Sequence, residues 1–386
     1  MIFQFSDKMS KKGRVLVAMS GGIDSTAAAM MLHEEGYEVV GITMKTWDYA
    51  NSGGSKKETG CCSLDSINDA RGVAVKMGFH HFIVDIREEF GDYVIDNFVD
   101  EYLAGRTPNP CVLCNTHIKW SALLKRADAL DCEFIATGHY AVINELNGRQ
   151  FVTKSADLNK DQSYVLWGLT QECLQRTQFP LGHMQKPAVR KYVFEGGFEE
   201  FSKKAESYEI CFVPDNDYRG FLKRRVPDLQ TTVKGGQFVN TEGAVIGTHE
   251  GYPFYTIGQR KGLGQAFGKP MFVTKIIPEN NTVVLGEMEE LMKNGMSVGK
   301  VNLQKYTHIP AEGIEAVTQI RYNDPGSLSQ VKNFLNPNEF GKDVAGQTLS
   351  VEFFANVKGV APGQSAVFYE GDDVVGGGII MGSYLT

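Results

Sequence analysis

The first half of the chain alternates short apolar runs with longer segments in which apolar residues recur at helical spacing. Short apolar runs bounded by turn residues indicate buried strands, whereas the longer periodic segments indicate helices. This pattern predicts strands at 14–18, 37–44, 80–86 and 132–136, and helices at 25–32, 63–78, 88–104, 116–130, 159–175 and 186–194. Strands that alternate with helices in this way form a mostly parallel sheet with helices on both faces.

The pattern changes after about Asp217, where short alternating runs are separated by turn residues. Such runs, for example 235–243 and 278–285, are typical of all-β structure. We therefore predict an α/β fold with a parallel sheet, followed by two small, mostly-β domains. The expected divisions are a flexible tail at 1–13, an α/β domain at 14–217, a central β domain at 218–296 and a C-terminal β-barrel-like domain at 297–386.

Other segments of the α/β part show no such alternation. Pro108 and Pro110 disfavour a helix, so we expect an extended loop over 105–115. We also expect an extended segment at 206–213 and a polar loop at 47–60. One face of the predicted helix at 88–104 carries large apolar residues that we assign to the core, namely Phe90, Val94, Phe98 and Tyr102.

A glycine-rich turn joins the first strand to the first helix, with the sequence Ser20-Gly-Gly-Ile-Asp-Ser25. The glycines allow the backbone to approach a ligand closely, and the free N–H groups at the start of the helix favour a phosphate. Asp24 is suited to hold a magnesium ion through water, and Ser20 and Ser25 are suited to donate to phosphate oxygens. The turn is not a Walker loop, because the required lysine is missing.

Composition and charge narrow the class of protein. The chain is 42% hydrophobic and 22% charged, which is typical of a globular protein, and no run of 18 apolar residues predicts a membrane span. The first 13 residues lack the features of a secretory signal, so we expect a cytoplasmic protein. The net charge of −7 argues mildly against a nucleic-acid partner, although a local basic stripe would still bind phosphates.

Seven cysteines with uneven spacing indicate a reducing compartment and specific roles for single thiols. Cys111 and Cys114 form a Cys-x-x-Cys pair. A structural zinc site would need further ligands at suitable spacing, and a thioredoxin-type pair would open a helix, whereas this pair is predicted to lie in the proline-rich loop. Two unconnected thiols remain the alternative. We assign the adjacent Cys61 and Cys62 to packing.

Strings spread over almost the whole chain resemble those of the tRNA-specific 2-thiouridylases, which belong to the PP-loop ATP pyrophosphatase superfamily. The matching strings are Ser20-Gly-Gly-Ile-Asp-Ser25, Gly105-Arg-Thr-Pro-Asn-Pro110, Leu113-Cys-Asn115, Ala136-Thr-Gly-His-Tyr140, Asn159-Lys-Asp-Gln-Ser-Tyr164, Ile210-Cys-Phe212, Thr256-Ile-Gly-Gln-Arg-Lys-Gly-Leu-Gly264 and Pro362-Gly-Gln-Ser-Ala-Val-Phe-Tyr369. The resemblance implies a sulfur transferase that acts on the wobble uridine of tRNA, with 14–217 as its PP-loop catalytic domain.

In the implied reaction, ATP adenylates O2 of the uracil with the help of Asp24 and magnesium. Cys211 carries a persulfide delivered by a sulfur-relay protein, and its terminal sulfur attacks C2. Cys114 then helps to release the sulfur, either by forming a disulfide with Cys211 or as a general catalyst. By the same resemblance, the ATP-binding residues are Ala18, Met19, Ser20, Gly21, Gly22, Ile23, Asp24, Ser25, Met44 and Gly138.

The chain departs from the better-known family pattern at Cys111, where many members have Asp. Together with Cys114 and Cys211, this residue gives three thiols that would hold a [4Fe-4S] cluster with one open iron. We therefore hypothesise that sulfide is carried on such a cluster. The persulfide route uses the same residues and stays open.

The resemblance also assigns residues to tRNA binding. Asn109, Pro110 and Cys111 would line the pocket of the target base, which must leave its stack to meet the cysteines. The other implied tRNA contacts are His139, Lys160, Asp161, Gln162, Arg321, Tyr322 and Gln364. Two basic segments, with Arg219, Lys223, Arg224 and Arg225 in one and Gly258-Gln-Arg-Lys-Gly262 in the other, are further candidates for phosphate contacts. Solvated surface is the alternative for Lys160 and Arg321, and a core histidine is the alternative for His139.

Two other functions compete with thiolation. Another PP-loop ligase would adenylate a small substrate, but it would not need three cysteines or the β domains. A non-catalytic tRNA-binding protein would tolerate a degenerate loop, whereas Asp24 and both serines of the loop are intact here. No membrane partner is expected.

Overall fold

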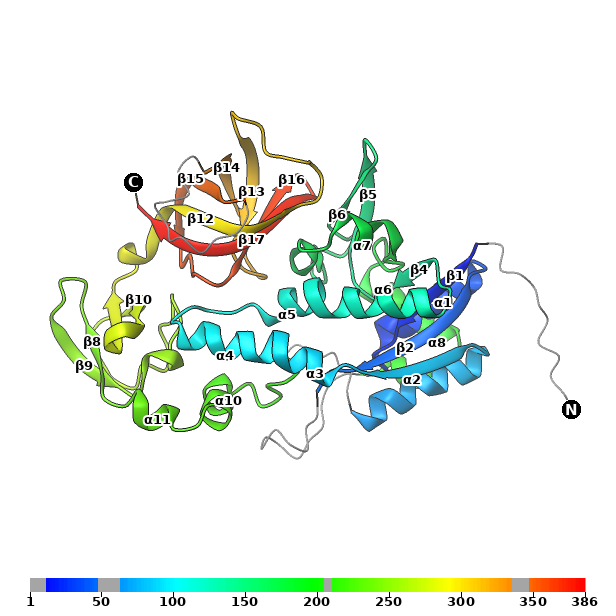
Figure 1. Cartoon of the computed structure of the whole chain (residues 1–386), viewed down its shortest axis with the longest axis horizontal. Coiled ribbons are helices and arrows are strands. Elements are labelled where there is room, and N and C mark those ends of the chain that lie inside the picture. The colour runs from blue at the N-terminus through cyan, green and yellow to red at the C-terminus, as the bar shows by residue number, and fades with distance from the viewer. Residues whose placement is uncertain (1–11, 48–62, 205–209, 335–346, 386) are drawn as a thin grey trace, which may run out of the picture. The chain divides into compact units, whose positions relative to one another are not determined.

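The computed structural model describes residues 12–47, 63–204, 210–334 and 347–385, and Figure 1 shows their helices and strands. The chain divides into two compact units, which are described separately below. Unit 1 contains the residues up to Gly91, Asn115–Ser163 and Leu169–Asp215. Unit 2 contains Asp92–Cys114, Tyr164–Gly168 and the residues from Asn216 onward. The described residues exclude the predicted loop at 47–60 apart from Trp47, the pair Cys61 and Cys62, and most of the tail at 1–13.

Unit 1 is built on a five-stranded sheet with the order β3-β2-β1-β4-β7, in which every pairing is parallel. Its strands are β1 (Arg14–Ala18), β2 (Glu38–Lys45), β3 (His80–Asp85), β4 (Phe134–Ala136) and β7 (Thr177–Gln178). Unit 1 also contains the antiparallel hairpin of β5 (Val142–Leu146) and β6 (Arg149–Thr153). The predicted parallel sheet is therefore confirmed.

The helices of unit 1 are α1 (Ile23–Glu34), α2 (Leu64–Met77), α3 (Arg87–Phe90), α6 (Trp120–Ala129), α7 (Gln171–Arg176), α8 (Lys186–Glu195) and α9 (Glu199–Ser202). Helices α1, α2 and α8 share one apolar core cluster with Val15 and Val17 of β1. Because successive strand residues face opposite sides of a sheet, the fully buried Leu16 points to the other face. The indole N–H of Trp120 in α6 donates to Thr177 of β7 at 2.8 Å.

Unit 2 begins with α4 (Asp96–Leu103) and α5 (Pro110–Leu113), and continues after Asn216 with α10 (Tyr218–Arg225) and α11 (Leu229–Thr232). A four-stranded sheet follows in the order β10-β11-β8-β9. Its strands are β8 (Gly236–Val239), β9 (Val245–His249), β10 (Phe272–Ile277) and β11 (Thr282–Gly286). Short 3-10 turns precede and follow β10, at Tyr252–Phe254 and Pro278–Asn280, and a third spans Glu289–Leu291.

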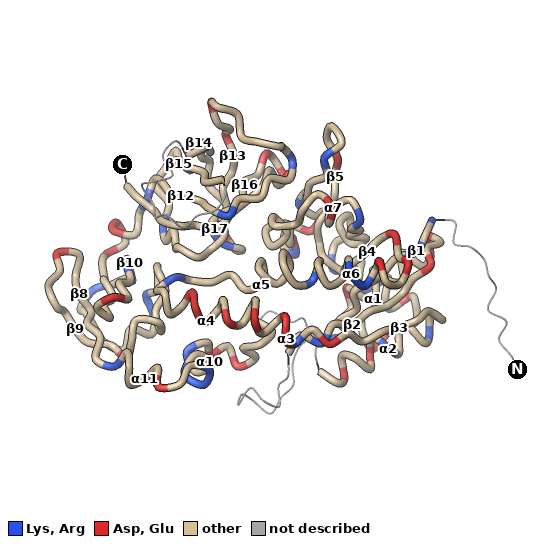
Figure 2. Tube along the Cα trace, in the orientation of Figure 1, with Lys and Arg blue, Asp and Glu red and all other residues tan. Residues whose placement is uncertain are grey.

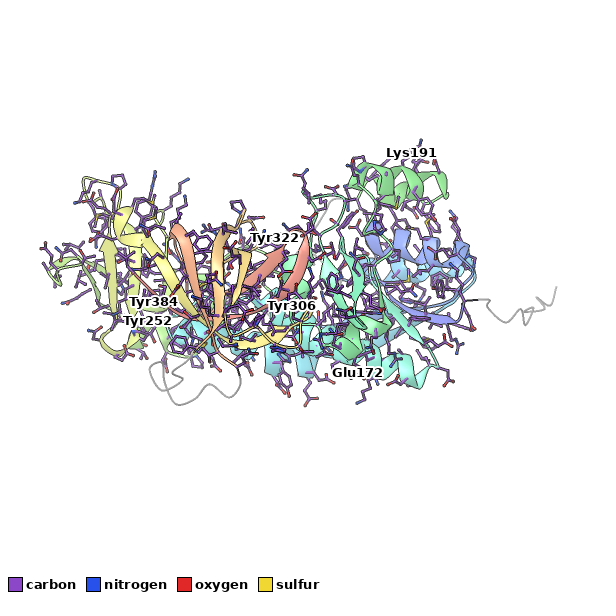
Figure 3. The ribbon with its side chains drawn as sticks, turned by 90° about the horizontal axis from the view of Figure 1, so that it is seen from above. Glu172, Lys191, Tyr252, Tyr306, Tyr322 and Tyr384 are labelled. Carbon is purple, nitrogen blue, oxygen red and sulfur yellow. The ribbon has the colours of Figure 1, made fainter. Side chains whose placement is uncertain are left out.

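A closed barrel completes unit 2. Its strands are β12 (Met292–Leu303), β13 (Ile314–Gln319), β14 (Ser327–Asn333), β15 (Leu349–Lys358), β16 (Ser365–Glu370) and β17 (Asp373–Tyr384). They pair in the order β12-β15-β14-β13-β16-β17, and β12 pairs again with β17 to close the ring. Figure 3 shows these strands with Tyr306 and Tyr322 beside them. The predicted all-β character after Asp217 is confirmed, apart from the two short helices α10 and α11.

The predicted helix at 88–104 is helical from Arg87 to Leu103, with a π-helical turn at Gly91–Ile95 between α3 and α4. The apolar face assigned to the core is buried, as its members are at most 7% exposed: Phe90, Val94, Phe98 and Tyr102. The predicted helices at 63–78, 116–130 and 186–194 are also present, the second with a π-helical start at Cys114–Lys119.

Three local predictions are wrong. The loop predicted over 105–115 ends at Asn109, because Pro110 occupies the first position of α5, where a proline costs no hydrogen bond. The helix predicted over 159–175 consists of a 3-10 turn at Ser163–Leu166 and of α7, with Gly168 between them. The described part of the segment predicted as extended at 206–213 is a turn, in which the N–H of Val213 donates to the carbonyl of Ile210 at 2.8 Å.

Candidate functional site

The turn between β1 and α1 has the tight geometry that its sequence predicts. The Ser25 hydroxyl donates to the carbonyl of Gly22 at 3.1 Å and accepts from the N–H of Ser20 at 3.2 Å. Gly21 has φ +69°, and an added Cβ would lie 2.1 Å from the carbonyl oxygen of Ser66. Gly22, the N-cap of α1, has no side chain to satisfy the first N–H groups of the helix. These groups are suited to bind an anion.

The other residues predicted to bind ATP lie at the same edge of the sheet. Ala18 pairs with Ile42 of β2, so Met44 lies beyond the end of β1 at the carboxyl edge. The Thr43 hydroxyl donates to the carbonyl of Met19 at 2.7 Å, which ties the turn to β2. Gly138 follows β4, and an added Cβ there would lie 2.6 Å from the carbonyl carbon of Asp24. A glycine at 138 is therefore required by the close approach of α1.

Asp24 has partners that the sequence did not reveal. The ammonium of Lys186 lies 2.7 Å from each oxygen of the Asp24 carboxylate, and the Tyr140 hydroxyl donates to Oδ1 at 2.8 Å. The Lys186 side chain is 8% exposed and that of Asp24 is 32% exposed. The carboxylate has the hard oxygen atoms that magnesium prefers, but Lys186 contacts both of them in this structure. A magnesium ion would therefore meet Asp24 through water or after Lys186 has moved.

A second lysine missed by the sequence analysis also reaches the turn. The Lys204 ammonium donates to the carbonyl of Gly21 at 3.0 Å and pairs with the carboxylate of Asp69. Both lysines lie more than 160 residues after the turn. The sequence contains one indication of a functional role for Lys186, because a lysine at the first position of a helix is disfavoured by the helix dipole. Lys204 offered no comparable signal.

Cys211 lies in the turn at Ile210–Val213 and is partly exposed. Its neighbour Phe212 is 1% exposed and contacts the rings of Phe90 and Trp47, with centroid distances of 5.9 and 6.2 Å. The buried ring therefore anchors the turn that carries Cys211.

The pair Cys111 and Cys114 opens a helix. The side chain of Asn109 caps α5 by accepting from the N–H of Val112 at 3.4 Å. Cys111 is exposed and Cys114 is 7% exposed. The argument that this pair lies in a loop, unlike a thioredoxin-type pair, is therefore wrong. The disulfide that the resemblance implies between Cys114 and Cys211 stays a prediction.

The three thiols proposed as cluster ligands fall in different units. Cys111 and Cys114 belong to unit 2 and Cys211 to unit 1, so their convergence stays a prediction. Among the described residues, no group of three or more His, Cys, Asp or Glu is arranged to hold a metal ion.

Several residues predicted to contact tRNA in unit 1 are engaged within the protein. The Asp161 carboxylate accepts from the N–H groups of Ser155 at 2.7 Å and Ser163 at 3.3 Å. Burial raises the pKa of this carboxyl, although the hydrogen bonds from Ser163 and Ser155 oppose the rise. The Gln162 side chain accepts from the N–H of Tyr140 at 3.0 Å. Asp161 and Gln162 therefore shape the segment that carries the partly exposed Lys160.

His139 packs as an aromatic group. Its ring lies 5.6 Å from that of Trp120 and 6.0 Å from that of Phe179, and it shares a 2.7 Å hydrogen bond with Thr137. Burial, with a smaller effect from the Lys119 charge, lowers the pKa of His139 to about 3. The ring is therefore neutral at physiological pH, as expected for the alternative of a core histidine.

The residues predicted to bind tRNA in unit 2 form a connected group. The Gln364 amide donates to the carbonyls of Thr107 at 3.0 Å and Pro108 at 2.9 Å, next to Asn109. Tyr164 links the segment that contains Asn109 to the barrel, because its hydroxyl donates to the carbonyl of Ser365 at 2.9 Å. Burial raises the pKa of Tyr164, while a hydrogen bond with Asn109 opposes the rise. Its ring lies 6.1 Å from that of Tyr322, which is 45% exposed beside the exposed Arg321.

Figure 2 shows basic residues along α10, and two of them form ion pairs within unit 2. Lys223 pairs with Glu250 at 3.2 Å and Arg225 pairs with Asp96 at 3.1 Å. Arg219 lies over the ring of Tyr255 and reaches the carbonyl of Gly262, at the end of the glycine-flanked basic loop. The helix and the loop thus lie together, as a phosphate-binding surface would require.

Comparison with known proteins covers nearly the whole chain. Residues 13–215 match the tRNA methyl transferase HUP domain, 219–287 the tRNA methyl transferase PRC-barrel domain, and 306–380 the aminomethyltransferase beta-barrel domain. Within the described residues, no helix is both long enough and apolar enough to cross a membrane.

Curated relatives are similar over nearly their full length. The tRNA-specific 2-thiouridylase MnmA of Cytophaga hutchinsonii is 62% identical over 97% of this chain and 99% of its own. The proteins of the same name from Amoebophilus asiaticus and Salinibacter ruber are 63% and 56% identical, over 97% and 96% of this chain and 96% and 95% of their own. With this identity and coverage, the chain belongs to the tRNA-specific 2-thiouridylase family.

Proposed function

We propose that this protein is a transferase that uses ATP to replace O2 of the wobble uridine of tRNA with sulfur. The observation that carries the proposal is the turn at Ser20–Ser25, which leaves the N-terminus of α1 uncapped at the carboxyl edge of a parallel sheet. Ligands of such sheets bind at this edge. Family membership supplies the identity of the substrate.

The turn and α1 would bind the phosphates of ATP. Backbone N–H groups and the positive end of the helix dipole stabilise the charge that develops at the α-phosphate. The uracil O2 attacks this phosphorus and pyrophosphate leaves, so O2 becomes part of an AMP leaving group. Magnesium, held near Asp24, would supply further stabilisation of the phosphate charge.

Cys211 would deliver the sulfur as a persulfide. The terminal sulfur attacks C2, the bond from C2 to the adenylated oxygen breaks, and AMP leaves. The Cys114 thiolate then attacks Sγ of Cys211, which forms a disulfide and leaves the terminal sulfur on the base. In this exchange the Cys114 thiolate is oxidised and the transferred sulfur is reduced, while Sγ of Cys211 keeps its oxidation state. A sulfur-relay protein of the cytoplasm would reload Cys211, and the disulfide must be reduced between turnovers.

An iron-sulfur cluster is the second candidate for the sulfur carrier. Thiols are the correct donors, and Cys111 and Cys114 lie three residues apart in one helical segment, a spacing that places them on the same face. Such a cluster would supply an iron site that binds sulfide. Anaerobic purification with iron and sulfide analysis tests this candidate. About four of each per chain, lost in Cys111→Ala, would support it, whereas an iron-free protein that is fully active with a persulfide donor would exclude it.

The proposed function is tested by AMP release and by mass spectrometry of the tRNA nucleosides. We expect AMP and 2-thiouridine in equal amounts when tRNA, ATP and a sulfur donor are present. AMP release with small acceptors in place of tRNA would instead indicate another PP-loop ligase. Binding of tRNA without pyrophosphate would indicate a non-catalytic RNA-binding protein.

A further inference from the structure

The position of Lys186 is not explained by its contribution to stability. Its side chain is 8% exposed, and its ammonium contacts both oxygens of Asp24. Removing the ammonium from water is unfavourable, and a buried ion pair is often no more stabilising than apolar side chains of the same size. A pair of this kind beside the nucleotide turn therefore calls for a functional explanation.

The local structure also disfavours a cation at this position. Lys186 is the first residue of α8, whose N-cap Gln185 makes no side-chain hydrogen bond and whose first turn has no acidic residue. Positive charge near a helix N-terminus is opposed by the helix dipole. The chain nevertheless fixes the residue there, because the N–H of Lys186 donates to the Asp157 carboxylate at 2.8 Å.

The carboxylate of Asp24 has a second donor that would remain if the ammonium moved. The Tyr140 hydroxyl donates to Oδ1 at 2.8 Å, and the Tyr140 ring lies 5.5 Å from the Lys186 ammonium. A carboxylate that keeps one hydrogen bond loses less free energy than one left without a partner. The cluster of Lys186, Asp24 and Tyr140 thus allows the ammonium to exchange one anionic partner for another.

We propose that Lys186 is the phosphate-binding cation of the nucleotide site and turns from Asp24 to a phosphate of bound ATP. The turn Ser20–Ser25 contains no lysine. Lys186 would supply, from α8, the charge that a Walker loop carries within its own sequence. The ammonium of Lys186 donates to Asp24, which lies in the first turn of α1. It is therefore beside the N–H groups that suit a phosphate. This inference rests on the proposed use of ATP.

The test compares the binding of ATP with that of adenosine to the full chain, by calorimetry without tRNA. We expect Lys186→Gln to weaken ATP binding roughly 10- to 100-fold, as for a lost charge-assisted hydrogen bond, and to change adenosine binding less than about twofold. Lys186→Arg should restore part of the preference for ATP, because a guanidinium also pairs with phosphate. The matched control is Lys191→Gln on the exposed side of the same helix (Figure 3), which should bind both ligands as the unaltered chain does.

Equal weakening of ATP and adenosine binding by Lys186→Gln would overturn the proposal, because it would indicate a structural role. Unchanged binding of both ligands would overturn it as well. A measurement on the unaltered chain avoids any folding defect: the ¹⁵Nζ resonance of Lys186 should shift with ATP and not with adenosine, and equal shifts would contradict the proposal. If the chain prefers ATP in this way but forms no 2-thiouridine, the proposed function fails while this inference stands.

Discussion

Each unit contains a nearly buried lysine that shares a carboxylate with a tyrosine hydroxyl. In unit 1, Lys186 and Tyr140 meet at Asp24. In unit 2, Lys305 and Tyr306 meet at Glu370. The Lys305 side chain is 11% exposed, close to the 8% of Lys186. The same three chemical groups thus occur in two different settings.

The settings differ in the elements that carry the carboxylates. Lys305 lies 3.0 Å from Glu370 and 2.9 Å from Asp373, which flank the turn between β16 and β17. Burial opposes the charge of Lys305, but hydrogen bonds to Asp373 and Glu370 outweigh it and raise the pKa of the lysine. Lys186 contacts the carboxylate of Asp24, on the first turn of the helix beside the nucleotide turn. We conclude that the barrel cluster stabilises a hairpin, whereas the unit 1 cluster is suited to exchange partners.

The largest expected difference between the clusters concerns activity. Asp24→Asn should lower the rate of thiolation at least about 100-fold, because it removes the charge that positions Lys186 and would attract magnesium. Glu370→Gln makes the corresponding change in the barrel and should leave the rate within about twofold. Initial rates of 2-thiouridine formation, measured after circular dichroism has shown both variants to be folded, check this prediction. Comparable losses of the thiolation rate in the two variants would contradict the distinction between the two clusters.

The second prediction concerns stability. Lys305→Met should lower the free energy of unfolding by about 2 kcal/mol, because Glu370 and Asp373 would face each other without a cation. The value is below that for a fully buried pair, since these carboxylates are 28% and 27% exposed. Urea denaturation measures the change. The double variant Lys305→Met with Asp373→Asn should recover part of the loss, and no recovery would contradict the electrostatic cause.

The third prediction concerns pH. Burial lowers the pKa of His249 from 6.5 to about 4, although a hydrogen bond to the Gln237 backbone opposes the shift. Between these values the unfolded state binds more protons than the folded state, so stability falls as the pH is lowered through this window. His249 should contribute a loss of about 2 kcal/mol between pH 7 and pH 5. Urea denaturation of His249→Gln at both pH values should show a smaller loss than the unaltered chain, and an identical loss would refute the assignment.

The smallest predicted effect is at Asn109. Asn109→Ala should reduce stability by roughly 0.5–1 kcal/mol, because α5 loses its N-cap. Asn109→Asp keeps a capping oxygen and should be nearly as stable as the unaltered chain. If Asn109 also lines the pocket of the target base, both variants should lose tRNA thiolation. Activity in Asn109→Asp equal to that of the unaltered chain would limit Asn109 to its structural role.

The sequence predicted the features that depend on neighbouring residues. Alternating strands and helices identified the parallel sheet, and Ser20–Ser25 identified the turn at its edge. The buried face of the helix at 88–104 followed from its spacing. These predictions succeeded because periodicity and glycine conformation act over a few residues.

The predictions failed where distant parts of the chain meet. They also failed where the effect of a residue depends on its position in a helix. Lys186 lies 162 residues after Asp24, so no local pattern connects them. The expectation that proline breaks a helix fails at Pro110, because a proline at the first helical position favours α5. The structure also shows that the side chains of Asp161 and Gln162 hold Ser155, Ser163 and Tyr140 in place, which the sequence did not indicate. The contacts with tRNA that the resemblance implies for Asp161 and Gln162 stay a prediction. The domain divisions at 217 and 296 and the roles of the three thiols stay predictions.

The most direct test of the central claim follows one oxygen atom. A tRNA that carries ¹⁸O at O2 of its wobble uridine is incubated with the protein, ATP and a persulfide donor, and the released AMP is examined by mass spectrometry. If ATP adenylates O2 before sulfur attacks C2, the AMP should carry one ¹⁸O for each 2-thiouridine formed. Unlabelled AMP formed together with 2-thiouridine would contradict the account, because the oxygen would then have left by a route that does not involve adenylation.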